Sequence, residues 1–272
     1  MGINETVLEM HFHKPLLDLF QVTLGLGKGK FNFYKYSTQK ECFVGFDQAF
    51  VQTDLTEDEL FTKLKKSAID DGYNLSNFFV GYFLQFKVVK ILQRHSRHTP
   101  SQVRFYPHYR VSIDTKKNIN TGLSQHELLY NLSRNNNAMV YYACPMIFDR
   151  SELYNQNIDL DLLRLADLND CPSMYSDNES HFIYYEDIEA EPVWCSEPVE
   201  GNAITPQHMF KRISENISKE EFYESQLELL NKLKYKSELN SQGEKEGILK
   251  LVQDSLTIIH YTADKEDKMP NE

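Results

Sequence analysis

The residues Phe-Phe-Val-Gly-Tyr-Phe-Leu-Gln-Phe-Lys-Val-Val, 78–89, form the most apolar strand that the sequence predicts. Their aromatic and β-branched side chains are typical of a central strand, buried on both faces of a sheet. Gln85 and Lys87 interrupt this pattern, and because side chains alternate along a strand, both project to the same face. A buried lysine is costly unless it has a partner. The stretch therefore predicts a central strand that carries a polar site.

A second predicted strand contains an acid where a core would hold an apolar residue. Residues 41–53 read Glu-Cys-Phe-Val-Gly-Phe-Asp-Gln-Ala-Phe-Val-Gln-Thr, and their β-branched and aromatic residues favour a strand. Asp47 lies in its interior, where a carboxylate needs a cation or hydrogen-bond donors. We interpret Asp47, Gln85 and Lys87 as one site, which requires that the two strands be neighbours.

The surrounding pattern alternates helices and strands. Apolar spacing predicts a helix over residues 5–24, interrupted near Pro15, and a short aromatic strand follows near residue 31. Capping boxes at Thr56 and Ser124, each with glutamate three residues later, begin helices over 57–70 and 125–135. Further strands are predicted over residues 104–113, 138–144 and 179–185. This order favours an α/β fold with a central mixed β-sheet flanked by helices.

The chain of 272 residues is long enough for one large domain with an appendage. We predict an α/β domain over residues 1–203. A helical C-terminal appendage over 204–272 would contain helices at 206–216 and 219–236 and a frayed tail from residue 264.

Cysteine spacing and hydropathy bear on the compartment. The four cysteines lie far apart without a C-x-x-C pair, which argues against structural zinc and a disulfide framework. The apolar stretches are too short to cross a bilayer, and residues 1–9 lack the features of a secretory signal. We therefore expect a cytoplasmic protein with no membrane partner.

Charge is segregated along the chain. The net charge is -11, yet residues 85–117 contain eight Lys or Arg against one Asp, whereas residues 151–200 contain thirteen Asp or Glu against one Arg. Both blocks could be solvated faces. Alternatively, the basic block contacts a phosphate backbone and the acidic block, 151–200, faces a protein partner. The candidate nucleic-acid-binding residues are Lys90, Arg94, Arg97, Arg104 and Arg110.

Asp47 with Gln85-x-Lys87 resembles the PD-(D/E)xK (restriction-endonuclease-like) nuclease superfamily, in the variant whose last half-motif is Q-x-K. The resemblance implies a restriction-endonuclease-like fold in which Asp47 and Gln85 bind Mg²⁺ or Mn²⁺ and Lys87 orients or deprotonates the attacking water. Members of the superfamily often add a glutamate from the first helix. Glu5 and Glu9 are candidates for it, as is Glu41 before the Asp47 strand, and we include Glu9 among the catalytic residues.

The resemblance implies a metal-dependent nuclease that hydrolyses phosphodiester bonds of DNA, as the effector of a bacterial antiphage defence or restriction system. Cutting both strands calls for two sites, which a homodimer would supply; a defence-system protein is the other expected partner. A non-catalytic interaction protein is the alternative, in which Lys87 and Asp47 form a structural ion pair. A third hypothesis is an inactive relative or nucleic-acid-binding module without cleavage.

Overall fold

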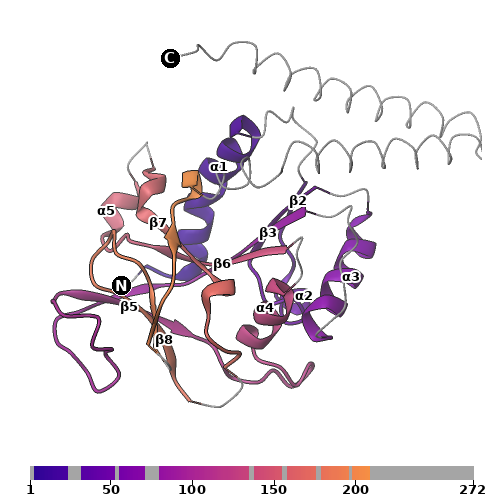
Figure 1. Cartoon of the computed structure of the whole chain (residues 1–272). Helices are drawn as coiled ribbons and strands as arrows, with labels where there is room; N and C mark the ends of the chain where they lie inside the picture. Colours follow the sequence, from indigo (N-terminus) through magenta and orange to yellow (C-terminus); the bar gives the residue numbers. More distant parts are fainter. Residues whose placement is uncertain are drawn as a thin grey trace, which may run out of the picture. The chain divides into compact units, whose positions relative to one another are not determined.

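A computed structural model describes residues 3–23, 32–52, 55–70, 80–134, 138–154, 158–175, 179–195 and 198–208 of the chain (Figure 1). The chain divides into two compact units, Met1–Leu19 with Phe31–Met209, and Phe20–Lys30 with Phe210–Glu272. The first unit contains all of the site residues considered below. The helices predicted at 206–216 and 219–236 and the tail from residue 264 lie outside the described residues, apart from the helical turn at 206–208.

The main sheet is mixed and has six strands in the order β1-β2-β3-β6-β7-β11. Strand β3 runs parallel to β6, and the other neighbouring pairs are antiparallel. The strands are β1 (Asn32–Tyr34), β2 (Gln48–Gln52), β3 (Val80–Phe86), β6 (Ala138–Pro145), β7 (Leu163–Asp167) and β11 (Ala203–Ile204). The predicted α/β class with a central mixed sheet is confirmed, and β3 is central in it, as the apolar stretch 78–89 indicated.

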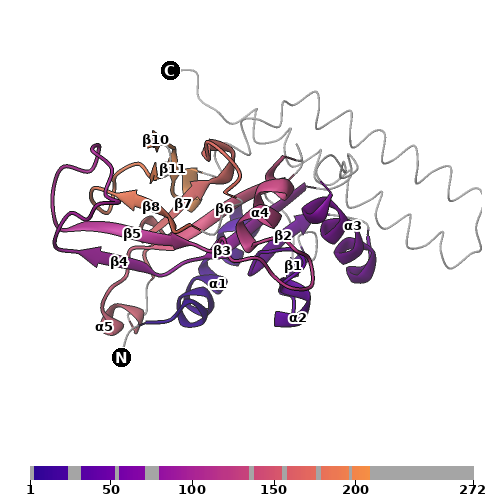
Figure 2. The ribbon, with the colours of Figure 1, turned by 90° about the horizontal axis from the view of Figure 1, so that it is seen from below.

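A second sheet, which the sequence did not predict, is antiparallel and has the order β10-β9-β8-β5-β4. Its strands are β4 (Val89–Leu92), β5 (His108–Ile113), β8 (His181–Tyr185), β9 (Val193–Trp194) and β10 (Val199–Glu200). The single strand predicted over residues 78–89 is therefore wrong, because the chain leaves the main sheet after Lys87 and Val89 pairs with Val111 of β5 instead. Figure 2 shows β4, β5 and β8 side by side.

In the part of the chain that the structure describes, the named α-helices are α1 (Glu5–Thr23), α2 (Thr38–Glu41), α3 (Glu57–Ile69), α4 (Gln125–Ser133) and α5 (Arg150–Leu153). Helix α1 runs through Pro15 as one helix, so the predicted interruption does not end it. The capping boxes at Thr56 and Ser124 are confirmed; the Glu127 N–H donates to Ser124 Oγ at 3.1 Å and the Ser124 N–H donates to Glu127 Oε2 at 2.6 Å. Two short 3₁₀ helices cover Leu160–Leu162 and Leu168–Asp170.

The hydrophobic core joins both sheets to α3 and α4. It includes Phe83 and Val140 of the main sheet, Val111 of the second sheet, Leu64 of α3 and Leu129 of α4, all fully buried. Removing such area from water stabilises a fold by about 25 cal/mol per Å². The core therefore holds the start of α4 and the end of β3 in place relative to each other, and the polar residues described next lie at that point.

Candidate active site

Asp47, which directly precedes β2, lies opposite Gln85 of the adjacent antiparallel strand β3. Gln48 pairs with Leu84 in the β2–β3 register, so the preceding residue, Asp47, faces Gln85. The Asp47 N–H donates to Leu84 O at 3.0 Å. Asp47 Oδ2 accepts hydrogen bonds from Gln85 Nε2 and from the Phe86 N–H, both at 2.8 Å. The strand adjacency that the sequence interpretation required is therefore present.

The turn before Asp47 depends on a glycine. Residues 41–47 were predicted to be strand, but α2 ends at Glu41 and β2 begins only at Gln48, so that part of the prediction is wrong. Gly45 has a φ of 83°, a conformation that other residues rarely adopt. A Cβ at this position would lie 3.1 Å from both Gln125 O and Leu129 Cγ of α4. Gly45 thus allows the loop to approach α4 and to place Asp47 directly before β2, at the end of the β2–β3 pair.

Lys87 is anchored directly after β3. Its N–H donates to Ala143 O at 2.9 Å, which extends the pairing with β6, and its side chain is buried, with only 7% of the residue exposed. The ammonium Nζ donates to Gln125 Oε1 at 2.7 Å and lies 4.0 Å from Glu5 Oε1. No ion pair joins Lys87 to Asp47 in the described part of the chain, so the structural pair considered above is not formed. Gln125 is a site residue that sequence reasoning did not assign to Lys87.

The three glutamate candidates all lie around this centre. Glu9, 4% exposed on α1, accepts a hydrogen bond from Gln48 Nε2 at 3.2 Å and pairs with Lys35. Glu41 hydrogen-bonds the Asp47 side chain. Glu5 approaches Lys87 as described above. Sequence reasoning missed Gln48 and Lys35, whose contacts with α1 depend on how the helix packs on the sheet.

Burial and neighbouring acids make the site costly to charge. Burial is the main cause that raises the pKa of Asp47 to about 7; the Phe86 N–H and the Lys87 ammonium oppose the shift, and the charges of Glu41 and Glu9 add to it. Burial also raises the pKa of Glu41, against the hydrogen bond from Asp47 and the charges of Lys35 and Lys87. An added cation would relieve the repulsion among these carboxylates.

The oxygen atoms left over at the site fit a hard divalent ion. Among the described residues, no three His, Cys, Asp or Glu side chains are placed so that they could hold a metal by themselves. Amide oxygens would have to contribute, and Gln85 Oε1 and Gln48 Oε1 are buried without a hydrogen-bond partner. An unsatisfied buried acceptor costs about 1–3 kcal/mol. Carboxylate and amide oxygens are the ligands that Mg²⁺ and Mn²⁺ prefer, so Asp47 and Gln85 have the chemistry that such an ion would need, and their role as ligands stays a prediction.

The basic residues singled out in the sequence belong to the second sheet, not to this centre. Lys90 of β4 pairs in register with Arg110 of β5, whose guanidinium carbon lies 4.5 Å from the centre of the Phe182 ring. Arg94, Arg97 and Arg104 are exposed on the connection between these strands. Across the ranges that the structure covers, no hydrogen bond joins any of the five to Asp47, Gln85 or Lys87.

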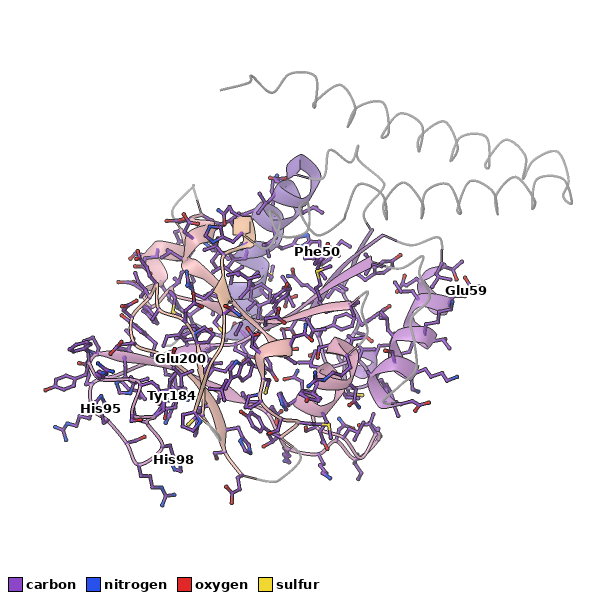
Figure 3. The ribbon with its side chains drawn as sticks, in the orientation of Figure 1. Phe50, Glu59, His95, His98, Tyr184 and Glu200 are labelled. Atoms are coloured by element: carbon purple, nitrogen blue, oxygen red, sulfur yellow. The ribbon has the colours of Figure 1, made fainter. Side chains whose placement is uncertain are left out.

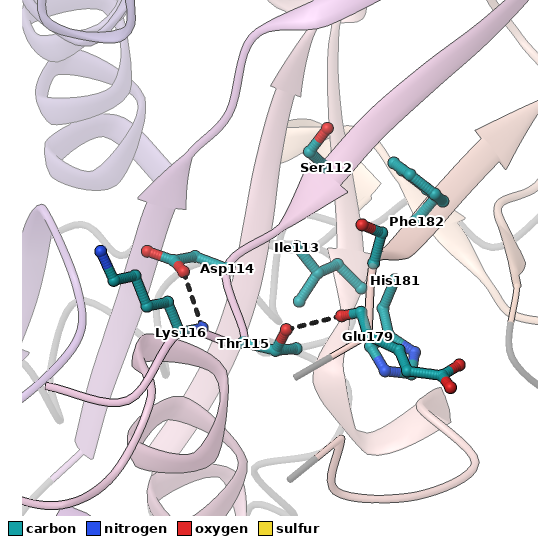
Figure 4. Close-up of a pocket in the computed structure, with 9 residues that line it drawn as sticks. Ser112, Ile113, Asp114, Thr115, Lys116, Glu179, His181 and Phe182 are labelled. Atoms are coloured by element: carbon teal, nitrogen blue, oxygen red, sulfur yellow. Dashed lines mark hydrogen bonds between the residues drawn. The ribbon is translucent and has the colours of Figure 1, made fainter. Parts of the chain in front are cut away.

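A pocket of about 350 Å³ lies elsewhere, at the end of β5 and the start of β8 (Figure 4). Asp114, Lys116, Glu179 and His181 are among the residues that line it. Thr115 Oγ1 donates to Glu179 O at 2.8 Å, and the Lys116 N–H donates to Asp114 Oδ1 at 3.0 Å. None of the proposed site residues lines this pocket.

Comparisons with known proteins leave the geometry as the basis for assignment. No protein-family model matches the chain, and no curated protein or solved structure is significantly similar to it. Within the described ranges, none of the helices is both long enough and apolar enough to span a membrane.

Proposed function

We propose that this protein is a metal-dependent nuclease that hydrolyses phosphodiester bonds of DNA. One observation carries the proposal: Asp47 is held against Gln85 by adjacent strands, and Lys87 follows two residues later with its ammonium group next to Gln125. The buried and unpartnered oxygen of Gln85 supports it, because this atom is available to a cation.

We further propose a restriction-endonuclease-like fold for the first unit. An aspartate at one strand, a Q-x-K sequence on the neighbouring strand and a buried glutamate on the first helix, Glu9, are what the resemblance leads one to expect. The helical appendage over 204–272 remains a prediction.

Each side chain has a distinct role in the proposed chemistry. A bound divalent ion would supply positive charge that stabilises the phosphate oxygens during hydrolysis. Asp47 and Gln85 would hold the ion, and Glu9 and Glu41 would add negative charge that favours it. The Lys87 ammonium would orient the attacking water and stabilise charge as it develops. Gln125 would position Lys87 through the 2.7 Å hydrogen bond.

Mg²⁺ or Mn²⁺ is the proposed cofactor and DNA the proposed substrate, with Lys90, Arg94, Arg97, Arg104 and Arg110 contacting the backbone. A homodimer or a defence-system protein is the proposed partner, the latter facing the acidic residues 151–200. An antiviral defence role and a cytoplasmic location are parts of the same proposal, based on the resemblance and on the free cysteines.

The test incubates the purified protein with plasmid and single-stranded DNA in Mg²⁺, Mn²⁺ or chelator. We expect metal-dependent cutting by the wild type and none by Lys87→Ala. Lys63→Ala on α3 is the matched control, since it removes a lysine away from the site, and it should cut like the wild type. Equal cutting by Lys87→Ala would exclude the proposed site.

The second candidate is an inactive relative that binds without cutting. It is favoured by the lack of three clustered His, Cys, Asp or Glu residues among those described, since many metal centres use such a set. This candidate predicts salt-dependent DNA binding with no cutting in either metal, and no change in affinity on Lys87→Ala.

A further inference from the structure

The connection between β4 and β5, residues 93–107, contacts the second sheet and its connections at several points. Val103 is 2% exposed and packs in a small cluster with Tyr184 of β8 and Val193 of β9. The next residue, Arg104, donates its N–H to Glu186 Oε1 at 2.9 Å. Cys195 Sγ donates to His98 O at 2.9 Å. This connection, here called the β4–β5 loop, is therefore held against the second sheet.

Two aromatic side chains project from this anchored loop. Phe105 and Tyr106 are each 68% exposed, although Val103 before them and His108 after them are buried. His95 supports the pair, because its Nε2 hydrogen-bonds Phe105 O at 3.4 Å and its ring packs edge-on against Tyr106 at 6.0 Å. Figure 3 shows His95 and His98 at one end of the unit, at the opposite end from Glu59 of α3. Two adjacent aromatic side chains are therefore exposed on a segment that several contacts hold in place.

The charged side chains of the loop itself have one sign, and the Glu186 carboxylate of the β8–β9 connection lies at the Arg104 N–H. The β4–β5 loop contains Arg94, Arg97 and Arg104 and no Asp or Glu, and all three arginines are exposed. Lys90 and Arg110, paired in register at the base of the loop, continue the positive surface along the second sheet. Exposed aromatics interleaved with arginines are suited to a polyanion whose flat rings can stack.

The loop is within reach of a substrate held at the candidate active site. Strand β4 begins two residues after Lys87, and seven residues separate Lys87 from Arg94. At about 3.3 Å per residue, these positions are at most about 23 Å apart. A nucleic acid of about seven base steps would span that distance.

We propose that the β4–β5 loop binds single-stranded nucleic acid by stacking unpaired bases on Phe105 and Tyr106, with the neighbouring arginines contacting phosphates. This inference rests on the proposed function, since it assigns to the nuclease a preference for unpaired substrate. Duplex DNA hides its base faces, so it would meet the arginines without using the rings.

Binding is measured in chelator, so that cleavage plays no part, by the fluorescence anisotropy of labelled oligothymidine and of a duplex of equal length. Phe105→Ala/Tyr106→Ala should weaken single-strand binding about tenfold or more and duplex binding less than threefold, since stacking on each base contributes substantially to affinity. The salt dependence of binding should not change, because no cation is removed.

Three comparisons separate stacking from other effects. Tyr154→Ala removes a tyrosine that is 81% exposed elsewhere and should leave affinity unchanged. Phe105→Leu/Tyr106→Leu keeps apolar bulk without rings and should behave like the alanine pair. An oligonucleotide with abasic sites should bind wild type as weakly as the alanine pair binds oligothymidine. Thermal unfolding, measured by circular dichroism, should be the same for all of these variants.

Unchanged single-strand affinity in the alanine pair would overturn the inference, as would full affinity in the leucine pair. If the alanine pair lost binding to anionic lipid vesicles but kept its affinity for single strands, the inference would also be overturned, and the loop would instead be a membrane-binding surface. The two proposals fail separately: stacking-dependent binding without metal-dependent cutting rejects the nuclease, whereas cutting without stacking-dependent binding rejects only the role of the loop.

Discussion

Two buried polar clusters in the same unit are built on different principles. In the cluster around His126, the ring Nδ1 hydrogen-bonds the Tyr142 hydroxyl at 2.8 Å and a further bond is made with the Ser173 backbone. Its ring also stacks on Tyr175, 5.0 Å between centroids. Burial lowers the pKa of His126 to about 3, so the cluster remains neutral.

The Asp47 cluster instead contains carboxyl groups that burial makes costly to ionise, and it is incompletely satisfied. Burial raises the pKa of Asp47 to about 7, and the side-chain oxygens of Gln85 and Gln48 have no partner. A fold gains nothing from such an arrangement by itself, whereas neutral and satisfied polar groups stabilise a core. The two clusters thus differ in how fully their polar groups are satisfied: we interpret the His126 cluster as structural, and we propose that the Asp47 cluster binds a ligand.

The largest expected effect is on catalysis. Asp47→Asn keeps the shape of the side chain but removes its charge, and it should lower the metal-dependent cutting rate about 1000-fold or more, as loss of a group that organises the reacting charges does. The measurement is single-turnover cleavage of labelled DNA. A rate within tenfold of wild type would break the contrast, because the Asp47 carboxylate would then have no catalytic use.

The next effect is on the pH dependence of stability. The two clusters should change the free energy of unfolding in opposite directions as the pH rises. Asp47 holds its proton in the folded state up to a pH of about 7 but in the unfolded state only up to about 3.8, so its contribution to stability falls as pH rises between these values, by up to about 4 kcal/mol. His126 has a pKa of about 3 in the folded state and 6.5 in the unfolded state. Its contribution to stability therefore rises as the pH rises between these two values, by up to about 5 kcal/mol.

Denaturant titrations from pH 4 to pH 8 in chelator separate these contributions. Asp47→Asn should remove the part of the fall that Asp47 contributes, and it should be more stable than wild type at pH 8. His126→Phe should remove the rise, so that the free energy of unfolding falls as the pH rises. If both variants follow the pH profile of the wild type, neither group is buried as the structure indicates.

A smaller effect is expected from the metal. At a concentration of Mn²⁺ 100 times the dissociation constant, wild type should gain about 2.7 kcal/mol of stability, since the ion binds the folded state. Gln85→Leu should lose most of this gain, because it removes the unpartnered amide oxygen, and His126→Phe should keep it. Thermal unfolding at pH 8 with and without Mn²⁺ is the measurement; an equal gain in Gln85→Leu would exclude this residue as a ligand.

The smallest effect concerns the hydroxyl that partners His126. Tyr142→Phe should lower the free energy of unfolding by about 1–2 kcal/mol, since the imidazole loses one hydrogen bond inside the core. The cutting rate per folded molecule should not change. Urea denaturation and cleavage of the same preparation check both parts, and a large loss of activity without loss of stability would assign the His126 cluster a part in catalysis.

The sequence by itself determined what depends on neighbours along the chain. The helices after Thr56 and Ser124 begin where their capping boxes predict, because a cap and its partner are three residues apart. Alternation along a strand predicts a common side for Gln85 and Lys87, and the segregated charge is a property of the order of residues along the chain. These features predicted the α/β class and brought attention to Asp47, Gln85 and Lys87.

Only the tertiary structure decided which segments meet. Four features depend on pairings between residues that are distant in sequence. The chain changes sheets after Lys87, and α1 brings Glu9 to Gln48. Gln125 reaches Lys87, and Phe105 and Tyr106 remain exposed to solvent. No local pattern contains that information, because the register of distant strands and the packing of helices on them are set by burial of the whole core.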